Sequence, residues 1–394
     1  MRIHHVKDVQ FCTKCSISNQ RPSSVVEYGN KAKKSTIFFD DKGVCSACRY
    51  HEIKYNEIQW LDREKELVSL LDKHRSNDGS YDVIVPSSGG KDSLYVAHIL
   101  KYKFGMNPLT VTWAPHAYTD IGYLNFQKNV DSGFDNVLIT PNRRVHRKLT
   151  QLAFKNLLHP FQPFMIGQKN VAPRVALEKN VKLIMYGESP IEGGTPLDIN
   201  SPIMPIDFFS KPKSEMESVF ISGVHCKDLQ KYNINKQDLI SYMPVVSEDI
   251  KDRGIEVHYM SYYKLWIPQE NYYYAVDNCG FRPNYSRSEG TYSKYISLDD
   301  KIDGFHFYTL YIKYGLGRCS YEAAQEVRNG HITRDEAVVL IRKYDGEFPE
   351  KYFQFFLEYI DISKEDFFRI IDEGRSPHLW DFSDGKFMLK HKIT

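Results

Sequence analysis

A short run rich in serine and glycine, Ser87-Ser88-Gly89-Gly90-Lys91-Asp92-Ser93, has the residue types that bind phosphate. The two glycines let the backbone approach a ligand closely and turn its amides toward it. An apolar pattern of helical spacing follows at residues 93–104, so the positive end of a helix is expected at the same place. Val85 stands where a Walker loop needs its first glycine. We therefore predict a phosphate site, and transfer of a γ-phosphate is disfavoured.

A second polar segment follows an apolar run at residues 181–186 and contains Gly187, Glu188, Glu192 and the pair Gly193-Gly194. Ligands of open parallel sheets bind beyond the carboxyl ends of the strands, so this segment should face the first loop. Gly187 and Glu188 are candidate contacts for ATP, and Glu188 could also contact a metal; an exposed loop glutamate is the alternative for Glu188. Glu192 is a candidate substrate contact, and the glycines permit a tight backbone.

Four of the seven cysteines form two Cys-x-x-Cys pairs, Cys12 with Cys15 and Cys45 with Cys48. Two such pairs supply the closed tetrahedral shell of sulfur that suits structural zinc, which would fold a small module. An iron–sulfur cluster and a redox pair are the alternatives. The 29 residues between the pairs exceed the usual spacing of about 15 to 20 in a zinc ribbon. The excess is expected as a basic loop around residues 30–34.

The middle of the chain alternates between strand and helix patterns. Gly105 lies where the C-cap of the helix at residues 93–104 is expected, and an amphipathic helix is predicted around residues 61–71. This alternation predicts an α/β protein with a parallel sheet. Strands are predicted at residues 81–86, 109–113, 136–140, 181–186 and 255–260.

The C-terminal third is predicted to be mainly helical. Between Tyr259 and Tyr314 lie 12 of the 27 tyrosines, which is typical both of a sugar-facing wall and of an aromatic core. N-cap residues and glycines predict three helices, and Thr333 begins a capping box. They could close over the sheet or form a homo-oligomer or partner surface. The three helices are predicted at residues 320–329, 333–344 and 363–373, with Ser320, Thr333 and Ser363 as their N-cap residues.

The same region holds the candidate residues for substrate binding. A guanidinium group can bind a carboxylate or a diphosphate in a bidentate manner, although a structural or solvated arginine is the alternative. The candidates are Arg282, Arg287, Arg318, Tyr274 and Tyr292.

Length and composition limit the class of protein. The 394 residues allow two or three domains, and 42% hydrophobic with 26% charged residues indicates a globular chain. The net charge of +2 gives no support to nucleic-acid binding. No stretch approaches the ~18 apolar residues of a membrane span, and the first residues lack a signal-peptide core. We expect a cytoplasmic protein without membrane contact.

The first loop resembles the PP-loop signature of the ATP pyrophosphatase superfamily. This resemblance implies an adenine nucleotide α-hydrolase-like sheet and cleavage of ATP between its α and β phosphates. It also implies that both serines bond phosphate oxygens, that the glycines offer amides, that Lys91 neutralises charge and that Asp92 helps to hold Mg²⁺. Asp92, Lys91 and Ser93 are thus the candidate catalytic residues. The resemblance is carried by Ser88, Gly89, Gly90, Lys91, Asp92 and Ser93.

Over nearly the whole chain the sequence resembles the bacterial N-acetyl sugar amidotransferases, which make acetamidino sugars for surface glycans such as lipopolysaccharide. The resemblance implies a substrate of the pseudaminic or legionaminic acid type, or a nucleotide-linked diacetamido sugar. The long loop between the cysteine pairs and the short connection from Glu188 to Gly193 depart from the pattern. The matching features are the cysteine pairs, Ser88 to Ser93, Gly187-Glu188, Pro268-Gln269-Glu270-Asn271-Tyr272-Tyr273-Tyr274, Arg287-Ser288-Glu289-Gly290-Thr291-Tyr292 and Gly315-Leu316-Gly317-Arg318.

The expected chemistry follows from the amide. An acetamide carbonyl has no leaving group, so its oxygen must be activated before nitrogen can replace it, and adenylation by ATP does this. We expect three domains: a four-cysteine zinc module at 1–55, an ATP pyrophosphatase domain at 56–260 and a helical, tyrosine-rich substrate or partner domain at 261–394. Ammonia would come from a separate glutaminase subunit or from solution, because the chain lacks a recognisable glutaminase nucleophile.

Two other functions remain open at this level. A PP-loop tRNA thiolase would also join this loop to cysteine pairs, but it predicts a basic surface and catalytic cysteines. Cys226, Cys279 and Cys319 form no close pair, and a buried inert thiol is the expectation for a lone cysteine such as Cys226 or Cys319. A non-catalytic ATP-binding protein needs only the phosphate site.

Overall fold

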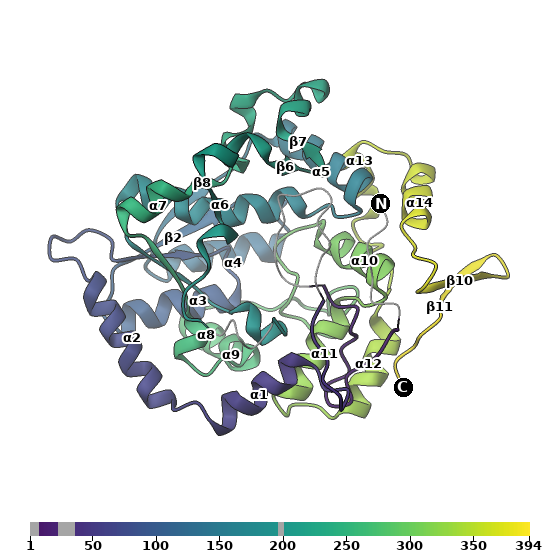
Figure 1. The fold of residues 1–394 in the computed structure, drawn as a ribbon, viewed down its shortest axis with the longest axis horizontal. Coiled ribbons are helices and arrows are strands. Elements are labelled where there is room, and N and C mark those ends of the chain that lie inside the picture. Colours follow the sequence, from purple (N-terminus) through teal and green to yellow (C-terminus); the bar gives the residue numbers. More distant parts are fainter. Residues whose placement is uncertain (1–7, 23–35, 196–200) are drawn as a thin grey trace.

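The fold is built around one parallel sheet (Figure 1). The computed structural model describes residues 8–22, 36–195 and 201–394, so the basic loop expected around residues 30–34 lies outside it. Five strands lie in the order β3-β2-β1-β4-β9, and every neighbouring pair is parallel. Each coincides within two residues with a predicted strand, so the α/β prediction is confirmed. The strands are β1 Val83–Pro86, β2 Pro108–Trp113, β3 Asp135–Ile139, β4 Leu183–Tyr186 and β9 Glu256–Tyr259.

Helices surround this sheet and make up most of the C-terminal third (Figure 1). The described residues contain α1 Ser46–Asn56, α2 Trp60–His74, α3 Lys91–His98, α4 Asp120–Asp131, α5 Arg143–Leu157, α6 Gln162–Lys179, α7 Ser247–Arg253, α8 Met260–Tyr263, α9 Pro268–Cys279, α10 Asp303–Tyr314, α11 Arg318–Arg328, α12 Arg334–Tyr344, α13 Phe353–Ile360 and α14 Lys364–Glu373. Short strands pair as β5 Ser210–Lys211 with β8 Val245–Val246, β6 Phe220–Ile221 with β7 Val224–His225, and β10 Trp380–Ser383 with β11 Lys386–Leu389.

The sheet is covered on both faces because successive strand residues point to opposite sides. Ile84 and Ile184 belong to a core that includes residues of α5 and α6. Val83 and Val85 belong to a second core with residues of α2 and α3. The central strands are therefore apolar on both sides, as in other parallel sheets.

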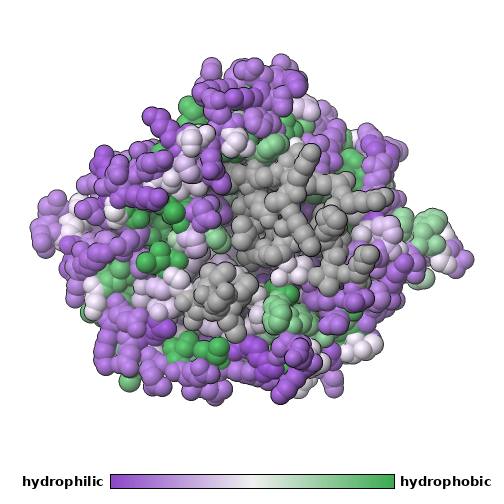
Figure 2. All heavy atoms as spheres, viewed as in Figure 1, coloured by the Kyte–Doolittle hydropathy of each residue, from purple (hydrophilic) through white to green (hydrophobic). Residues whose placement is uncertain are grey.

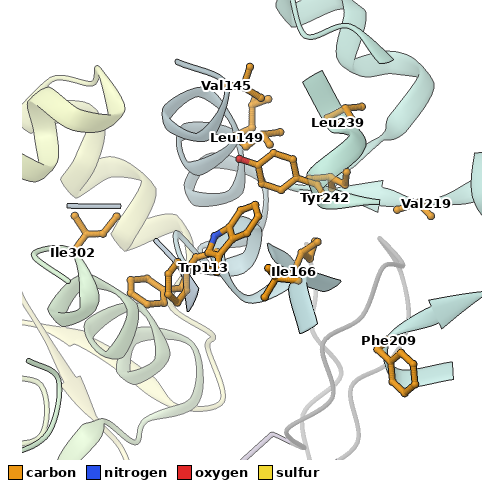
Figure 3. Close-up of a cluster of buried hydrophobic side chains, with 14 of the residues drawn as sticks. Trp113, Val145, Leu149, Ile166, Phe209, Val219, Leu239, Tyr242 and Ile302 are labelled. Atoms are coloured by element: carbon orange, nitrogen blue, oxygen red, sulfur yellow. The ribbon is translucent and has the colours of Figure 1, made fainter. Parts of the chain in front are cut away.

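Trp113, at the end of β2, lies at the centre of the larger core. Its ring lies edge-on to that of Tyr242 with the centroids 5.5 Å apart, and Figure 3 shows Val145 and Leu149 of α5 beside Tyr242. Gly167 of α6 makes this packing possible, because a Cβ there would lie 2.1 Å from an atom of the indole. The core thus fixes α6 directly against β2.

The C-terminal region differs from the prediction in two details. Helices α11, α12 and α14 confirm the three predicted ones, and Thr333 caps α12 in the expected capping box with Glu336. The prediction of Ser320 as an N-cap is wrong: α11 begins at Arg318 after the N-cap Gly317. Ser320 instead donates from its main-chain nitrogen to Asp345 at 3.1 Å. The hairpin of β10 and β11 was not predicted.

The surface is mainly hydrophilic on the face seen in Figure 2, where the hydrophobic residues form separate small groups. Phe382 and Met388 of the projecting β10–β11 hairpin are among the exposed hydrophobic residues. Among the described residues, every helix is too short or too polar to cross a membrane.

The loop between β1 and α3 has one glycine that its conformation requires. Gly89 has a φ of +89°, and a Cβ there would lie 2.7 Å from the carbonyl carbon of Asn125 in α4. Gly90 is the N-cap of α3 and has an ordinary φ of −71°. The close approach of α4 to the loop therefore depends on Gly89 and not on Gly90.

We expect Gly89→Ala to lower the free energy of unfolding by about 2 kcal/mol or more, because it adds both a clash and backbone strain. Gly90→Ala is the matched control, since the nearest atom to its Cβ would be Ser88 Oγ at 3.7 Å. Its cost should be about 1 kcal/mol or less. Urea denaturation of both variants measures the difference, and equal losses would contradict this account of the loop.

Candidate active site and metal centre

The loops that follow β1 and β4 meet where the strand order reverses. β2 lies on one side of β1 and β4 on the other, so the chain leaves the two strands in different directions and opens a crevice. A cavity of about 400 Å³ lies at this place. Its walls are residues 88–92, residues 188–193, the first turns of α4, residues 295–299 and one face of α11. The two polar segments singled out in the sequence therefore line one cavity.

Ser88 and Ser93 of the first loop lie differently. Ser88 lines the cavity, but Ser93 does not. The Ser93 hydroxyl donates to the carbonyl of Gly90 at 2.9 Å and accepts from Ser87 Oγ at 3.0 Å. In this structure Ser93 therefore holds the loop in shape, and Ser88, Gly89 and Gly90 present it to the cavity.

Asp92 is held at both carboxylate oxygens. Lys91 Nζ donates to Oδ2 at 2.6 Å, and the side-chain amide of Asn271 in α9 donates to Oδ1 at 3.0 Å. Lys91 is buried, whereas the side chain of Asp92 is 40% exposed. Asp92 is therefore a preorganised acceptor that cavity water can reach.

Glu192 is paired with a buried lysine from α1. Lys54 Nζ lies 3.0 Å from each Glu192 carboxylate oxygen and donates to the carbonyl of Trp266 at 2.5 Å. Burial raises the pKa of Glu192, and the ammonium of Lys54 opposes the rise. Glu192 thus anchors the segment after β4 to the N-terminal region, although it also borders the cavity.

Two further carboxyl groups face the cavity with raised pKa values. The surrounding protein, with Glu192 and Asp92, raises the pKa of Glu188 to about 7, although its side chain remains open to cavity water. Glu188 has no hydrogen-bond partner among the described residues. Burial and the neighbouring Asp300 raise the pKa of Asp299 to about 6, and a hydrogen bond from Ser88 opposes the rise. Asp299 was not among the residues predicted from the sequence.

One face of α11 forms the opposite wall. Arg318 donates to Glu322 one turn later, and Arg328 donates to the main-chain carbonyl of Glu192 at 3.4 Å. The polar side chains recur at the spacing of one helical face, which is the signal that could have found them. The lining residues of this face are Arg318, Tyr321, Glu322, Gln325 and Arg328.

Gly187, Tyr274 and Arg282 do not line this cavity. A Cβ at Gly187 would lie 2.8 Å from Trp266, so the glycine serves packing. The Tyr274 hydroxyl bonds His98 Nδ1 at 2.8 Å in the core beside α3. Arg282 contributes through its backbone, which exchanges hydrogen bonds of 2.8 and 2.9 Å with the side chain of Asn125.

Arg287 and Tyr292 also lie outside the cavity. Arg287 forms a bidentate pair with Glu347, with both distances 2.6 Å, and lines a neighbouring cavity of about 540 Å³. Tyr292 packs against the cluster that contains Cys319, and its hydroxyl has no partner in the part of the chain that the structure describes. Of the six candidate substrate residues, only Glu192 and Arg318 line the first cavity.

The four N-terminal cysteines come together as their spacing predicts. Their sulfur atoms all lie within 4.8 Å of one another and are buried. Cys12 Sγ lies 3.8 Å from Cys48 Sγ, and Cys15 Sγ lies 3.6 Å from Cys45 Sγ. Main-chain nitrogens also donate to Cys12 Sγ, that of Cys45 at 3.3 Å. Hydrogen bonds with Cys15 and the other two thiols lower the pKa of Cys12.

This geometry fits a single tetrahedral metal ion. A zinc–sulfur distance of about 2.3 Å puts neighbouring sulfurs about 3.8 Å apart, close to the distances observed. A four-iron cluster needs more separation, because each thiolate binds a different iron. The four cysteines could therefore hold one metal ion with no open position.

Comparisons with known proteins give partial matches. Residues 289–393 match the family model described as LPS biosynthesis protein WbpG-like, C-terminal domain. An uncharacterized protein of Methanocaldococcus jannaschii is 34% identical over 88 residues, which are 22% of this chain and 31% of that protein. This match covers less than a third of the relative's length.

A solved structure, the U34-tRNA thiolase NcsA from Methanococcus maripaludis with its 4Fe-4S cluster, covers 82% of this chain and 86% of its own. The sequence identity is 13% and the TM-score is 0.28. This likeness carries no argument about fold or function.

Elemental analysis should find about one zinc per purified chain, bound by the four clustered thiols. The double variant Cys45→Ser/Cys48→Ser should lose it. Cys226→Ser is the control, because Cys226 is half-buried and lies apart from the cluster. A metal content unchanged in the double variant would contradict the assignment of the site.

Proposed function

We propose that the protein is an ATP-dependent amidotransferase that converts the acetamido group of an N-acetyl sugar into an acetamidino group, releasing AMP and pyrophosphate. One observation carries the proposal: the serine-glycine loop after β1 and the acidic segment after β4 line a single cavity at the crossover of the sheet. This is where open parallel sheets bind nucleotides.

The residues around the loop suit a triphosphate. Ser88 and the amides at the start of α3 offer donors, and Lys91 adds positive charge. Bound Mg²⁺ would neutralise phosphate charge, with Asp92 as its expected ligand. The ion pair with Lys91 and the amide of Asn271 keep Asp92 in place before any ligand enters.

Activation then precedes nitrogen transfer. The amide oxygen attacks the α-phosphorus of ATP, and the bond from that phosphorus to pyrophosphate breaks. Glu188, which has a pKa near 7 and no hydrogen-bond partner within the described ranges, is suited to accept the amide N–H proton. The resulting O-adenylyl imidate adds ammonia at its carbon, and AMP departs with the former amide oxygen. The product is an acetamidine.

The match of residues 289–393 to a lipopolysaccharide biosynthesis domain supports a sugar as the acceptor. The class of sugar, a nonulosonic acid or a nucleotide-linked diacetamido sugar, rests on the family resemblance. Ammonia would come from a separate glutaminase subunit or from solution. Because ATP is the co-substrate, we place the reaction in the cytoplasm.

The tRNA thiolase alternative has less support. No cysteine lines the cavity among the described residues. Burial raises the pKa of Cys279 to about 11 and also raises that of Cys319, so both thiols are protonated at neutral pH. Pyrophosphate release stimulated by tRNA would favour the thiolase, and release stimulated by an N-acetyl sugar favours the amidotransferase. A non-catalytic ATP-binding protein would release none with either.

Asp92→Ala should reduce sugar-dependent pyrophosphate release by about 100-fold, because it removes a charged group positioned at the reacting phosphates. Asp131→Ala is the control, since Asp131 lies on the exposed end of α4 and pairs with Lys128 of the same helix. Asp131→Ala should keep the melting temperature of the wild type, and Asp92→Ala should still fold but melt at a lower temperature, because buried Lys91 loses its carboxylate partner. A folded Asp92→Ala protein with near-normal release would overturn the role of Asp92.

A further inference from the structure

Among the described residues, four cations line the cavity, and three of them already have partners. Lys91 pairs with Asp92, and Arg318 pairs with Glu322. Arg328 donates to Cys15 Sγ at 3.6 Å and to a main-chain carbonyl at 3.4 Å. Each of these three side chains thus has a protein partner in this structure.

Arg21 is the fourth cation, and it is different. Its guanidinium carbon lies 4.5 Å from the centroid of the Tyr321 ring, so the group stacks on α11. In the part of the chain that the structure describes, nothing pairs with this guanidinium or accepts a hydrogen bond from it. Glu188 lies close enough to interact with it electrostatically without forming an ion pair. A half-buried guanidinium with unused donors at a cavity wall is suited to bind an anion.

The N-terminal module that is folded around Cys12, Cys15, Cys45 and Cys48, here called the cysteine module, holds Arg21 in this position. Arg21 follows Cys15 by six residues, and its main-chain nitrogen donates to the carbonyl of Ser18 at 3.1 Å. Its own carbonyl accepts from Ile37 at 3.1 Å. The module in turn packs on Ala324 and Val327 of α11. The backbone hydrogen bonds that place Arg21 therefore lie in the segment that the four cysteines fold.

We propose that Arg21 binds an anionic oxygen of a substrate in the cavity, and that the cysteine module completes the reaction pocket by supplying it. The chemistry is that of a phosphate or a carboxylate. Its source is either the triphosphate of ATP or an acidic group of the acceptor. The proposal rests on the proposed function only for the identity of the acceptor. It gives the N-terminal module a part in substrate binding beyond folding itself.

Arg21→Gln tests the proposal, since it removes the charge and the bidentate donors. Losing a hydrogen bond to a charged group should weaken binding about tenfold or more. The matched control is Arg63→Gln. The guanidinium carbon of Arg63 lies 3.6 Å from the centroid of the Tyr262 ring, and Arg63 lies outside the cavity. Calorimetry with Mg-ATP and no acceptor measures the affinity for ATP. The KM for the sugar that the wild type converts reports on binding of the acceptor.

A weaker ATP affinity assigns Arg21 to the phosphates, and a raised KM for the sugar with normal ATP affinity assigns it to the acceptor. Both quantities within about twofold of the wild type, in a folded variant of normal metal content, overturn the proposal. If Arg21→Gln loses metal or stability, Arg21→Lys replaces it as the test variant. Arg21→Lys keeps the charge and should weaken binding of the same substrate, but less strongly than Arg21→Gln.

The cysteine variant supplies an independent readout. Cys45→Ser/Cys48→Ser should weaken binding of the same substrate as Arg21→Gln, and adding Arg21→Gln to it should weaken that binding little further. If the losses of binding in the two variants were fully additive, Arg21 would act independently of the cysteine module. If the wild type converts no sugar, the proposed function fails, and binding of Mg-ATP alone then decides the proposal for Arg21: an ATP affinity of Arg21→Gln within about twofold of the wild type overturns it.

Discussion

The pairing of β1 with β2 on one side and with β4 on the other is the constraint on which the site depends. Ile84 pairs with Leu109 and with Ile184 in parallel register, so the chain leaves β1 and β4 at one edge of the sheet and turns in different directions. The serine-glycine loop and the acidic segment must then face one another. Gly89 completes this arrangement, because only a residue without a Cβ lets α4 close the cavity.

Parts distant in sequence complete the cavity. Lys54 of α1 fixes Glu192 from the N-terminal side, and Ser46 of the same helix donates to the carbonyl of Gly194 at 2.6 Å. Arg328 of α11 connects Cys15 with the backbone of Glu192. The four-cysteine cluster, the segment after β4 and α11 therefore support each other, and disrupting that cluster should change the shape of the cavity.

The local parts of this structure could be predicted from the sequence, but among the long-range contacts only those implied by the parallel-sheet pattern and by the paired cysteines could. Strand periodicity, the glycines after β1 and the paired cysteines are signals within a few residues. Asp299 and Lys54 reach the site only through tertiary packing, so nothing near them in sequence marks them. For Tyr274 the sequence left a substrate contact and a core position open, and in the structure its hydroxyl bonds His98 in the core. Serine is a common N-cap residue, which is why Ser320 was expected to begin the helix. The N-cap of α11 is instead Gly317, whose main-chain nitrogen donates to Asp345.

Isotope transfer tests whether the amide oxygen is adenylated before nitrogen enters. An acceptor whose acetamido oxygen is labelled with heavy oxygen would be incubated with enzyme, ATP, Mg²⁺ and ammonia, and the products analysed by mass spectrometry. If adenylation comes first, AMP carries one labelled oxygen and pyrophosphate carries none. Label in inorganic phosphate with ADP formed, or label kept in the sugar product, would contradict it.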